Sequence, residues 1–114
     1  MDKQEKKQRI SEYKARKIIG GVYRIYNRPE DKNLVQLGVN LQGCQNRFDF
    51  CKRTGSCVDL RLQRAWSRLG CEAFEFEILE TLDQKEAQTQ AEFLEELELL
   101  LKLWLEKWEP EQLY

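Results

Sequence analysis

The chain has 114 residues, of which 41% are hydrophobic and 34% charged, as in one soluble globular domain with a single core. It contains no uncharged apolar run of about 18 residues, and its basic N-terminus lacks the apolar stretch of a secretory signal. The sequence therefore excludes a transmembrane helix and a membrane partner and predicts a cytoplasmic protein, while the net charge of −1 argues against a strong non-specific binder of polyanions.

The first third of the chain predicts a polar segment followed by two strands. Residues 1–18 are rich in charge and poor in apolar side chains, which predicts a polar helix or arm that ends at Gly20 and Gly21. β-Branched and aromatic residues predict strands over 21–27 and 34–40. The polar segment between the strands contains proline and aspartate, so the two strands are predicted to form an antiparallel hairpin.

Two helices are predicted in the middle of the chain. The first covers 41–53, although Gly43 weakens its first turn. The second covers 59–69 and ends at Gly70. At spacings of three and four residues, this helix has an inner apolar stripe and an outer basic stripe. The inner stripe is Leu62, Trp66 and Leu69, and the outer stripe is Arg61, Arg64 and Arg68.

The last third predicts a strand and a long helix. Apolar and acidic residues alternate over 74–79, which indicates a strand with one solvated face. A leucine-rich helix then runs from Asp83 or Thr89 to a stop at Pro110. Leucines extend beyond its buried stripe, so the 91–108 segment is predicted either to be sandwiched or to contact a protein partner or a second copy. The stripe is Phe93, Leu97, Leu100, Leu101, Trp104 and Trp108.

The order of these elements predicts an α+β domain with a small, mainly antiparallel three-stranded sheet flanked by helices. The predicted domain covers 19–109, preceded by the segment 1–18 and followed by a tail over 110–114.

Four cysteines occur without a Cys-x-x-Cys pair, and the chain contains no histidine. The spacing therefore does not match a zinc site, and a cytoplasmic location predicts reduced, mostly buried thiols. A redox or metal role is the alternative. The residues are Cys44, Cys51, Cys57 and Cys71.

Charge is distributed unevenly along the sequence. Residues 1–20 hold seven Lys or Arg against three acids, and residues 41–70 hold six against two. Residues 80–114 hold three against ten. An anionic partner is therefore expected to meet the first two segments, because the third repels it.

Three segments resemble the GIY-YIG nuclease family, which includes phage homing endonucleases and the incision subunit of bacterial nucleotide-excision repair. Gly21-Val22-Tyr23, followed by Arg-Ile-Tyr-Asn, is similar to the first signature strand. LQRAWSRLG over 62–70 is similar to the family's second helix, and FEFEILE over 74–80 is similar to its third strand. The resemblance covers about residues 19–108 and implies the family's fold.

The resemblance also implies a site for phosphodiester hydrolysis. In this family two tyrosines on neighbouring strands, an arginine on the first helix and a glutamate on the last helix act around a divalent ion, here expected to be Mg²⁺. Tyr23 matches the first tyrosine, and its alternative interpretation is an ordinary strand tyrosine. Arg47 matches the arginine if one residue, such as Gly43, is inserted, whereas Asn46 stands at the strict spacing. The alternative for Arg47 is a solvated surface arginine.

The sequence departs from the family pattern at two positions. The second signature reads Gln36-Leu37-Gly38 in place of Y-I-G, so a glutamine replaces the second tyrosine. Leu101 stands where the glutamate is expected, and Glu98, the nearest carboxylate on that face, lies about 4–5 Å away along the helix axis. No metal ligand is therefore assigned. Because loss of one preorganised group raises a barrier by about 3 kcal/mol, these changes predict weak or lost hydrolysis.

Two hypotheses for function follow. In the first, the domain cuts nucleic acid, with DNA expected rather than RNA. The reaction would use Mg²⁺ together with Tyr23, Arg47 and an unidentified carboxylate. In the second, it is a degenerate family member that binds nucleic acid or a protein on the same fold. In both, the outer stripe of Arg61, Arg64 and Arg68 is predicted to contact phosphates. The alternative is a solvated stripe whose arginines pair with Glu72, Glu75 or Glu77.

Overall fold

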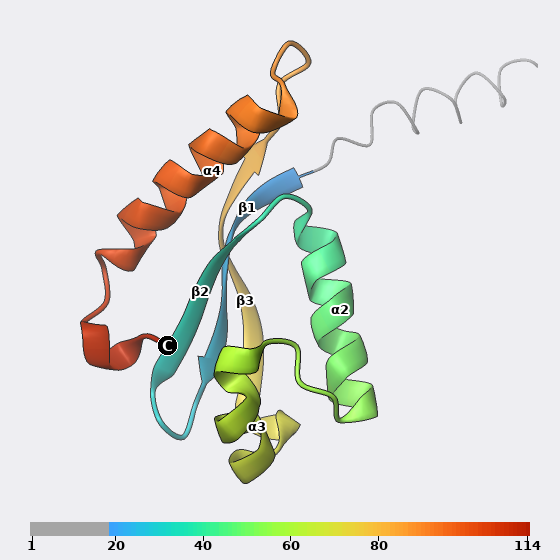
Figure 1. Cartoon of the computed structure of the whole chain (residues 1–114), viewed down its shortest axis with the longest axis vertical. Coiled ribbons are helices and arrows are strands. Elements are labelled where there is room, and N and C mark those ends of the chain that lie inside the picture. The colour runs from blue at the N-terminus through green and yellow to red at the C-terminus, as the bar shows by residue number, and fades with distance from the viewer. Residues whose placement is uncertain (1–18) are drawn as a thin grey trace, which may run out of the picture.

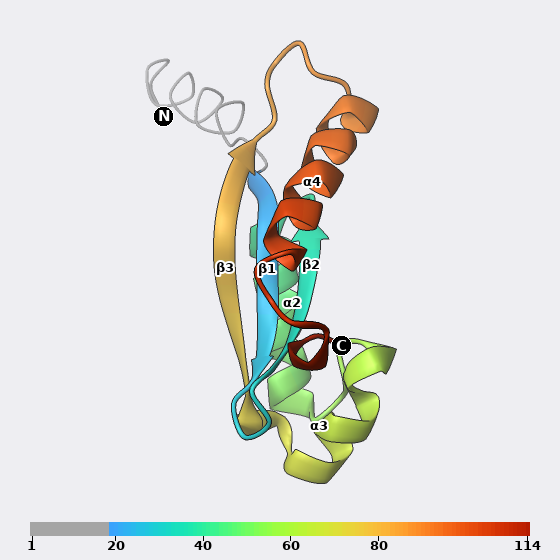
Figure 2. The same ribbon diagram turned by 90° about the vertical axis from the view of Figure 1, so that its left-hand side faces the viewer.

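The computed structural model describes residues 19–114, and the predicted polar segment 1–18 lies outside the described residues. Three strands form one antiparallel sheet in the order β2-β1-β3, with α2 and α3 on one face and α4 on the other (Figures 1 and 2). The predicted α+β class is confirmed. The elements are β1 (Ile19–Asn27), β2 (Lys32–Gly38), α2 (Leu41–Thr54), α3 (Gln63–Leu69), β3 (Phe74–Asp83) and α4 (Gln90–Leu105).

The predicted hairpin forms from β1 and β2, and β2 begins two residues before its predicted start. Lys32 pairs with Asn27, so the connection is a tight turn in which Asp31 adopts a left-handed φ of 50°. Further along, Tyr23 lies opposite Gln36 and therefore shares a face of the sheet with it. The alternation of side chains along β1 decides which residues reach α2 and which reach α4.

The main core lies between the sheet and the two helices α2 and α3. Leu62 and Phe74 are fully buried, and the Trp66 ring packs on the Phe74 ring with 5.0 Å between centroids. The inner apolar stripe predicted for the second helix is therefore largely correct. The cluster consists of Ile25, Leu34, Phe48, Cys51, Leu62, Ala65, Trp66 and Phe74.

The opposite face of the sheet is covered by α4. The helix begins at the capping box of Thr89 and Glu92, the later of its two predicted starts, and it ends at Leu105, before the predicted stop. Phe93 and Leu97 are fully buried beneath it. A Cβ atom at Gly20 would lie 2.8 Å from the Phe93 ring, so the glycine is needed for this close approach of helix and strand.

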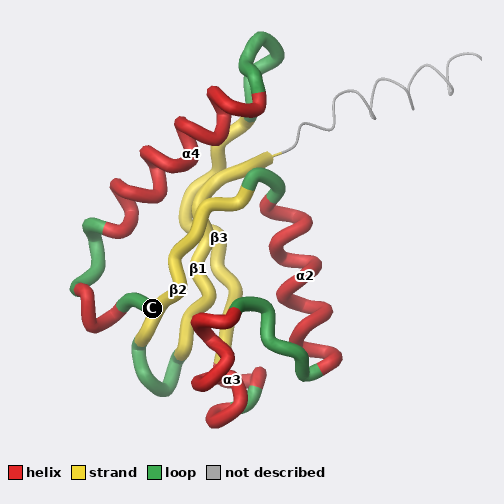
Figure 3. The backbone as a smooth tube through the Cα atoms, viewed as in Figure 1, coloured by secondary structure: helices red, strands yellow, loops and turns green. Residues whose placement is uncertain are grey.

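The segment 110–114, predicted as a tail, packs back onto β2 (Figure 3). The backbone N–H of Tyr114 donates to the carbonyl of Asn33 at 3.0 Å, and the Asn33 side chain donates to the carbonyl of Gln112 at 3.2 Å. The Asn27 side chain donates to the Tyr114 hydroxyl at 2.8 Å. Both asparagines are buried, so the segment supplies the hydrogen bonds that they need.

The third strand is longer than predicted. It runs to Asp83 and pairs along all of β1, with a register irregularity between Val22 and Tyr23. On the α4 side of the sheet, Glu77 forms an ion pair with Arg24 at 2.8 Å. None of the helices within 19–114 combines the length and the apolar character that a membrane crossing requires.

We expect Phe74→Ala to lower the free energy of unfolding by about 3–5 kcal/mol, because it opens a cavity in the main core. Phe50 on α2 is 56% exposed, so the matched variant Phe50→Ala should stay within about 0.5 kcal/mol of the parent. Urea unfolding followed by circular dichroism measures both. Equal losses in the two variants would show that the core is not built around Phe74.

Candidate functional site

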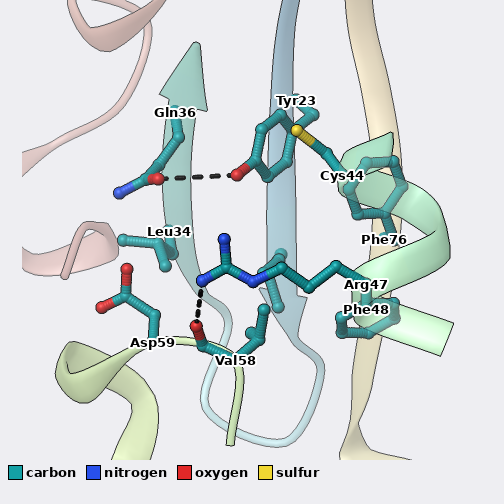
Figure 4. A pocket seen from close by; sticks show the side chains of 10 residues that line it. Tyr23, Leu34, Gln36, Cys44, Arg47, Phe48, Val58, Asp59 and Phe76 are labelled. Atoms are coloured by element: carbon teal, nitrogen blue, oxygen red, sulfur yellow. Dashed lines mark hydrogen bonds between the residues drawn. The ribbon is translucent and has the colours of Figure 1, made fainter. Parts of the chain in front are cut away.

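One pocket on the α2 side of the sheet brings together both predicted catalytic residues (Figure 4). Tyr23 enters it from β1 and Arg47 from α2, and Gln36 joins them from β2. The cavity volume is about 50 Å³, which is room for a few water molecules or one small polar group but not for a nucleobase. A larger ligand therefore reaches this pocket with a single group.

The start of α2 explains why Arg47 points into the pocket. The Asn40 side chain caps the helix and accepts a hydrogen bond from the Gly43 N–H at 3.1 Å, so the glycine predicted to weaken the first turn is part of the cap. Cys44, Arg47 and Phe48 then follow at spacings of three and four residues and line the pocket together.

The Tyr23 ring is fixed by its neighbours. It stacks on Phe76 with 4.9 Å between ring centroids, and Cys44 lies beside it (Figure 4). Burial raises the pKa of the Tyr23 phenol to about 12, Cys44 adds to the rise, and the charge of Arg47 opposes it. The phenol is therefore neutral at physiological pH, with a hydroxyl proton that it can donate in a hydrogen bond.

The amide of Gln36 links the Tyr23 hydroxyl to Arg61. Gln36 lies 3.5 Å from the hydroxyl on one side and faces the Arg61 guanidinium on the other. With the amide oxygen turned towards Arg61, it accepts from Nη2 and, at 3.3 Å, from Nη1. The amide nitrogen then faces the hydroxyl oxygen of Tyr23, which leaves the phenol proton for another acceptor.

The charge of Arg47 is available to a ligand. Its guanidinium extends from α2 across the pocket, and Nη2 donates to the carbonyl of Val58 at 2.9 Å (Figure 4). None of the four ion pairs found within residues 19–114 involves Arg47. The Val58 carbonyl thus orients the guanidinium without neutralising it.

Asp59 lines the same pocket and was not among the site residues predicted from the sequence. Its carboxylate accepts three hydrogen bonds from Arg61: from the backbone N–H at 2.8 Å, Nε at 3.1 Å and Nη2 at 3.0 Å. Burial favours the neutral acid, but these bonds and the charges of Arg61 and Arg47 outweigh it and hold the pKa of Asp59 below its ordinary value. An aspartate before a helix is a recognisable N-cap signal, whereas its place in the pocket depends on the loop before it.

The residues that line the pocket do not fit the Mg²⁺ site that the resemblance implies. Among the described residues, Asp59 is the one carboxylate lining the pocket, and Arg61 already occupies its oxygens. The described part of the chain has no group of three or more side chains suited to hold a metal ion. Leu101 lines a neighbouring hollow with Gln36 and Arg61, so the position expected for the glutamate lies near these two residues, but its side chain carries no oxygen.

The three arginines predicted as one stripe have different surroundings. Arg61 turns towards Asp59 and Gln36, and Arg68 forms an ion pair with Glu30 at 2.6 Å. Two of the three predicted alternative partners are engaged elsewhere, since Glu75 pairs with Arg28 at 3.2 Å and Glu77 with Arg24, and Glu72 forms no ion pair with a described residue. All four cysteines are free thiols, of which Cys44 lines the Tyr23 pocket.

The backbone matches the catalytic domain of the homing endonuclease I-TevI. The match has a TM-score of 0.57 and 20% sequence identity, and it covers 77% of this chain and 86% of that domain. A point mutant of the same domain matches with a TM-score of 0.57 and 19% identity, over 78% of this chain and 82% of that one. The fold is that of a GIY-YIG nuclease domain.

The resemblance seen in the three sequence segments is thereby confirmed for the GIY-YIG fold. No protein-family model and no curated protein matches the sequence. Because identity with the solved domains is low, the match establishes how the backbone runs, and the chemistry has to be argued from the side chains of this chain.

We expect the difference between the ultraviolet titration curves of the parent and of Tyr23→Phe to show one phenol that titrates with a midpoint near pH 12. The folded pKa lies above the ordinary value of 10.0, so the neutral phenol stabilises the fold below about pH 10, and this contribution is lost as the pH rises towards 12. The parent should therefore lose stability more steeply than Tyr23→Phe between pH 10 and 12. A midpoint at or below 10 would contradict the buried, neutral phenol.

Proposed function

We propose that this chain binds nucleic acid through its phosphates at the Tyr23–Arg47 pocket and that it hydrolyses phosphodiesters slowly or not at all. The observation that carries the proposal is the convergence of Tyr23, Gln36 and the unpaired Arg47 in one small pocket. We expect DNA rather than RNA as the ligand, because the solved domains with this fold come from a homing endonuclease.

The pocket is rich in groups that donate hydrogen bonds. The Tyr23 hydroxyl, the free nitrogens of Arg47 and the amide of Gln36 all border it, and Arg61 lies directly behind the amide. A phosphate oxygen is an acceptor with a negative charge, and a planar guanidinium matches its geometry. The donor set therefore favours a phosphodiester over an uncharged ligand.

The same pocket is poor in groups that remove a proton. The raised pKa of Tyr23 keeps the phenol protonated, and a glutamine amide is not a base. The carboxylate of Asp59 is ionised but held by Arg61 on both oxygens. If the chain is active, Mg²⁺ is the expected cofactor, and a carboxylate would have to leave its present partner to hold it.

The distribution of charge supports an anionic ligand on this face. The segment 41–70, which contributes α2, α3 and the loop between them, carries the excess of basic residues, whereas 80–114 is strongly acidic. A polyanion is attracted to the first segment and repelled by the second, so it approaches from the side of α2 and α3.

A second candidate function is protein contact through the 91–108 helix. Leu99 and Leu103 lie one turn apart on α4 and are 61% and 52% exposed, so they present apolar surface on the outside of the helix. Such contact is compatible with nucleic-acid binding because the two leucines lie outside the Tyr23 pocket.

Binding is tested with fluorescently labelled single-stranded DNA and the variants Arg47→Gln and Arg53→Gln. Arg53 is exposed in the last turn of α2 and serves as the matched control. We expect Arg47→Gln to weaken binding by about tenfold or more, since it removes a charged hydrogen-bonding group, and Arg53→Gln to change it little. Fluorescence anisotropy at several salt concentrations measures both. Absence of binding by the parent at low salt would overturn the proposal.

Hydrolysis is tested with plasmid and structured DNA in Mg²⁺ or Mn²⁺. We expect little or no cleavage by the parent protein, because the pocket lacks a free base and a free carboxylate. Robust cleavage that disappears in Tyr23→Phe and persists in the surface variant Tyr26→Phe would show instead that the site is a working nuclease.

A further inference from the structure

The geometry points to a second binding site, for the backbone phosphates that follow the one in the Tyr23 pocket along the same nucleic-acid strand. This site is a shallow groove between α3 and the β1–β2 hairpin, which we name the hairpin groove. It rests on the proposed function, because the strand that enters it is the one held at Tyr23 and Arg47. Its lining residues are Glu30, Lys32, Leu60, Arg61, Arg64, Ala65, Arg68 and Tyr114.

The hairpin groove is basic on its α3 wall and carries one cation and one acid on its hairpin wall. Arg61, Arg64 and Arg68 line it from η1 (Leu60–Leu62) and α3, and Lys32 lines it from the first residue of β2. Glu30 is the one acid among the described residues that line it. The arginine wall was predictable from the sequence, but the lysine opposite was not, because Lys32 is 29 residues away from Arg61 along the chain and meets it through the fold.

The hairpin groove and the Tyr23 pocket are connected along the surface. Gln36 borders the Tyr23 pocket and also a hollow that Arg61, Leu101 and Tyr114 line. Arg61 and Tyr114 in turn border the hairpin groove. One strand can therefore pass from Arg47 over Gln36 and Arg61 to Lys32 and Arg64 along adjoining hollows. Such a row of cations at successive positions suits a chain of phosphodiesters.

Tyr114 holds Lys32 in the hairpin groove. The lysine Nζ lies 4.9 Å from the centre of the Tyr114 ring, a cation–π contact. Tyr114 is itself fixed, because its backbone N–H donates to Asn33 and its hydroxyl accepts from Asn27. Tyr114 is therefore a positioning residue for the ammonium group.

The cations of the hairpin groove differ in how far they are already engaged. Arg64 forms no ion pair with any residue of the described chain, so its charge is open to a phosphate. Arg68 is paired with Glu30, and hydrogen bonds from Asn27 and Arg68 hold the pKa of Glu30 below its ordinary value. Lys32 and Arg64 thus carry the proposal, and Arg68 contributes after a phosphate displaces Glu30.

The test compares two double variants that remove the same charge. Lys32→Gln with Arg64→Gln strips the hairpin groove, whereas Arg53→Gln with Lys102→Gln removes two exposed cations outside it. Anisotropy titrations use single-stranded DNA of 3 and of about 12 nucleotides over a range of salt. For the longer strand, we expect the groove variant to lower the slope of log affinity against log salt by about 1.4 and the control to leave it unchanged.

The length of the strand separates this proposal from the proposed function. A trinucleotide has two bridging phosphates, so once it is held at the Tyr23 pocket it cannot also occupy both Lys32 and Arg64, and the groove variant should lose much less affinity for it than for the longer strand. If the parent fails to bind either strand, the proposed function fails. If the parent and the Arg47→Gln variant behave as expected but the groove variant binds the longer strand like the control, the hairpin groove is wrong and the pocket stands.

Two substitutions of Tyr114 test how Lys32 is positioned. Tyr114→Phe keeps the ring beneath the lysine and should retain the affinity and salt slope of the parent for the longer strand. Tyr114→Leu removes the ring and should approach the salt slope of Lys32→Gln. Urea unfolding shows that each variant is folded. Equal salt slopes of the two variants would overturn the positioning role. In a separate competition experiment, displacement of DNA by a poly-glutamate peptide would show that the groove binds acidic chains in general and is not a phosphate site.

Discussion

The pairing of β1 with β2 in one register is the constraint on which the rest of the site depends. It places Tyr23 opposite Gln36 and turns both side chains towards α2, where Arg47 meets them. A shift of the strand register by one residue would turn Tyr23 to the α4 side of the sheet, and the pocket would no longer form. The register is secured at the turn end of the pair, by the tight turn before Lys32 and by the return of the chain to Asn33. Stability and site geometry therefore rest on the same hydrogen bonds.

The site that results is one in which donors outnumber bases. Burial keeps the Tyr23 phenol protonated, Gln36 supplies an amide, and the Asp59 carboxylate is committed to Arg61. Coulomb attraction and hydrogen bonding to a phosphate need none of these groups to change protonation state, whereas hydrolysis needs a proton acceptor and charge neutralisation at the leaving oxygen. This composition of the pocket is the basis of the proposed function, binding of a phosphodiester with slow or no cleavage.

Local patterns sufficed to predict most of the fold. Alternation and β-branched residues located the strands, and three- and four-residue spacings located the helices, because these signals act within a few residues. The convergence of Tyr23 and Arg47 required the family resemblance, since no local rule relates a strand to a helix 24 residues away. The contact of Arg61 with Gln36, the place of Asp59 and the return of 110–114 to Asn33 were not predictable. Each depends on the path of a loop and on which buried polar group lacks a partner.

An NMR titration of the arginine side chains with a short single-stranded oligonucleotide shows whether Arg47 and Arg61 bind the same strand of phosphates. We expect the Nε–Hε signals of Arg47 and Arg61 to shift together, and that of Arg64 to join them as the oligonucleotide lengthens, while that of Arg53 does not shift. Addition of Mg²⁺ should leave the oligonucleotide uncleaved. Uniform shifts of all arginines, no shift at Arg47, or cleavage of the oligonucleotide would each contradict the proposed binding site.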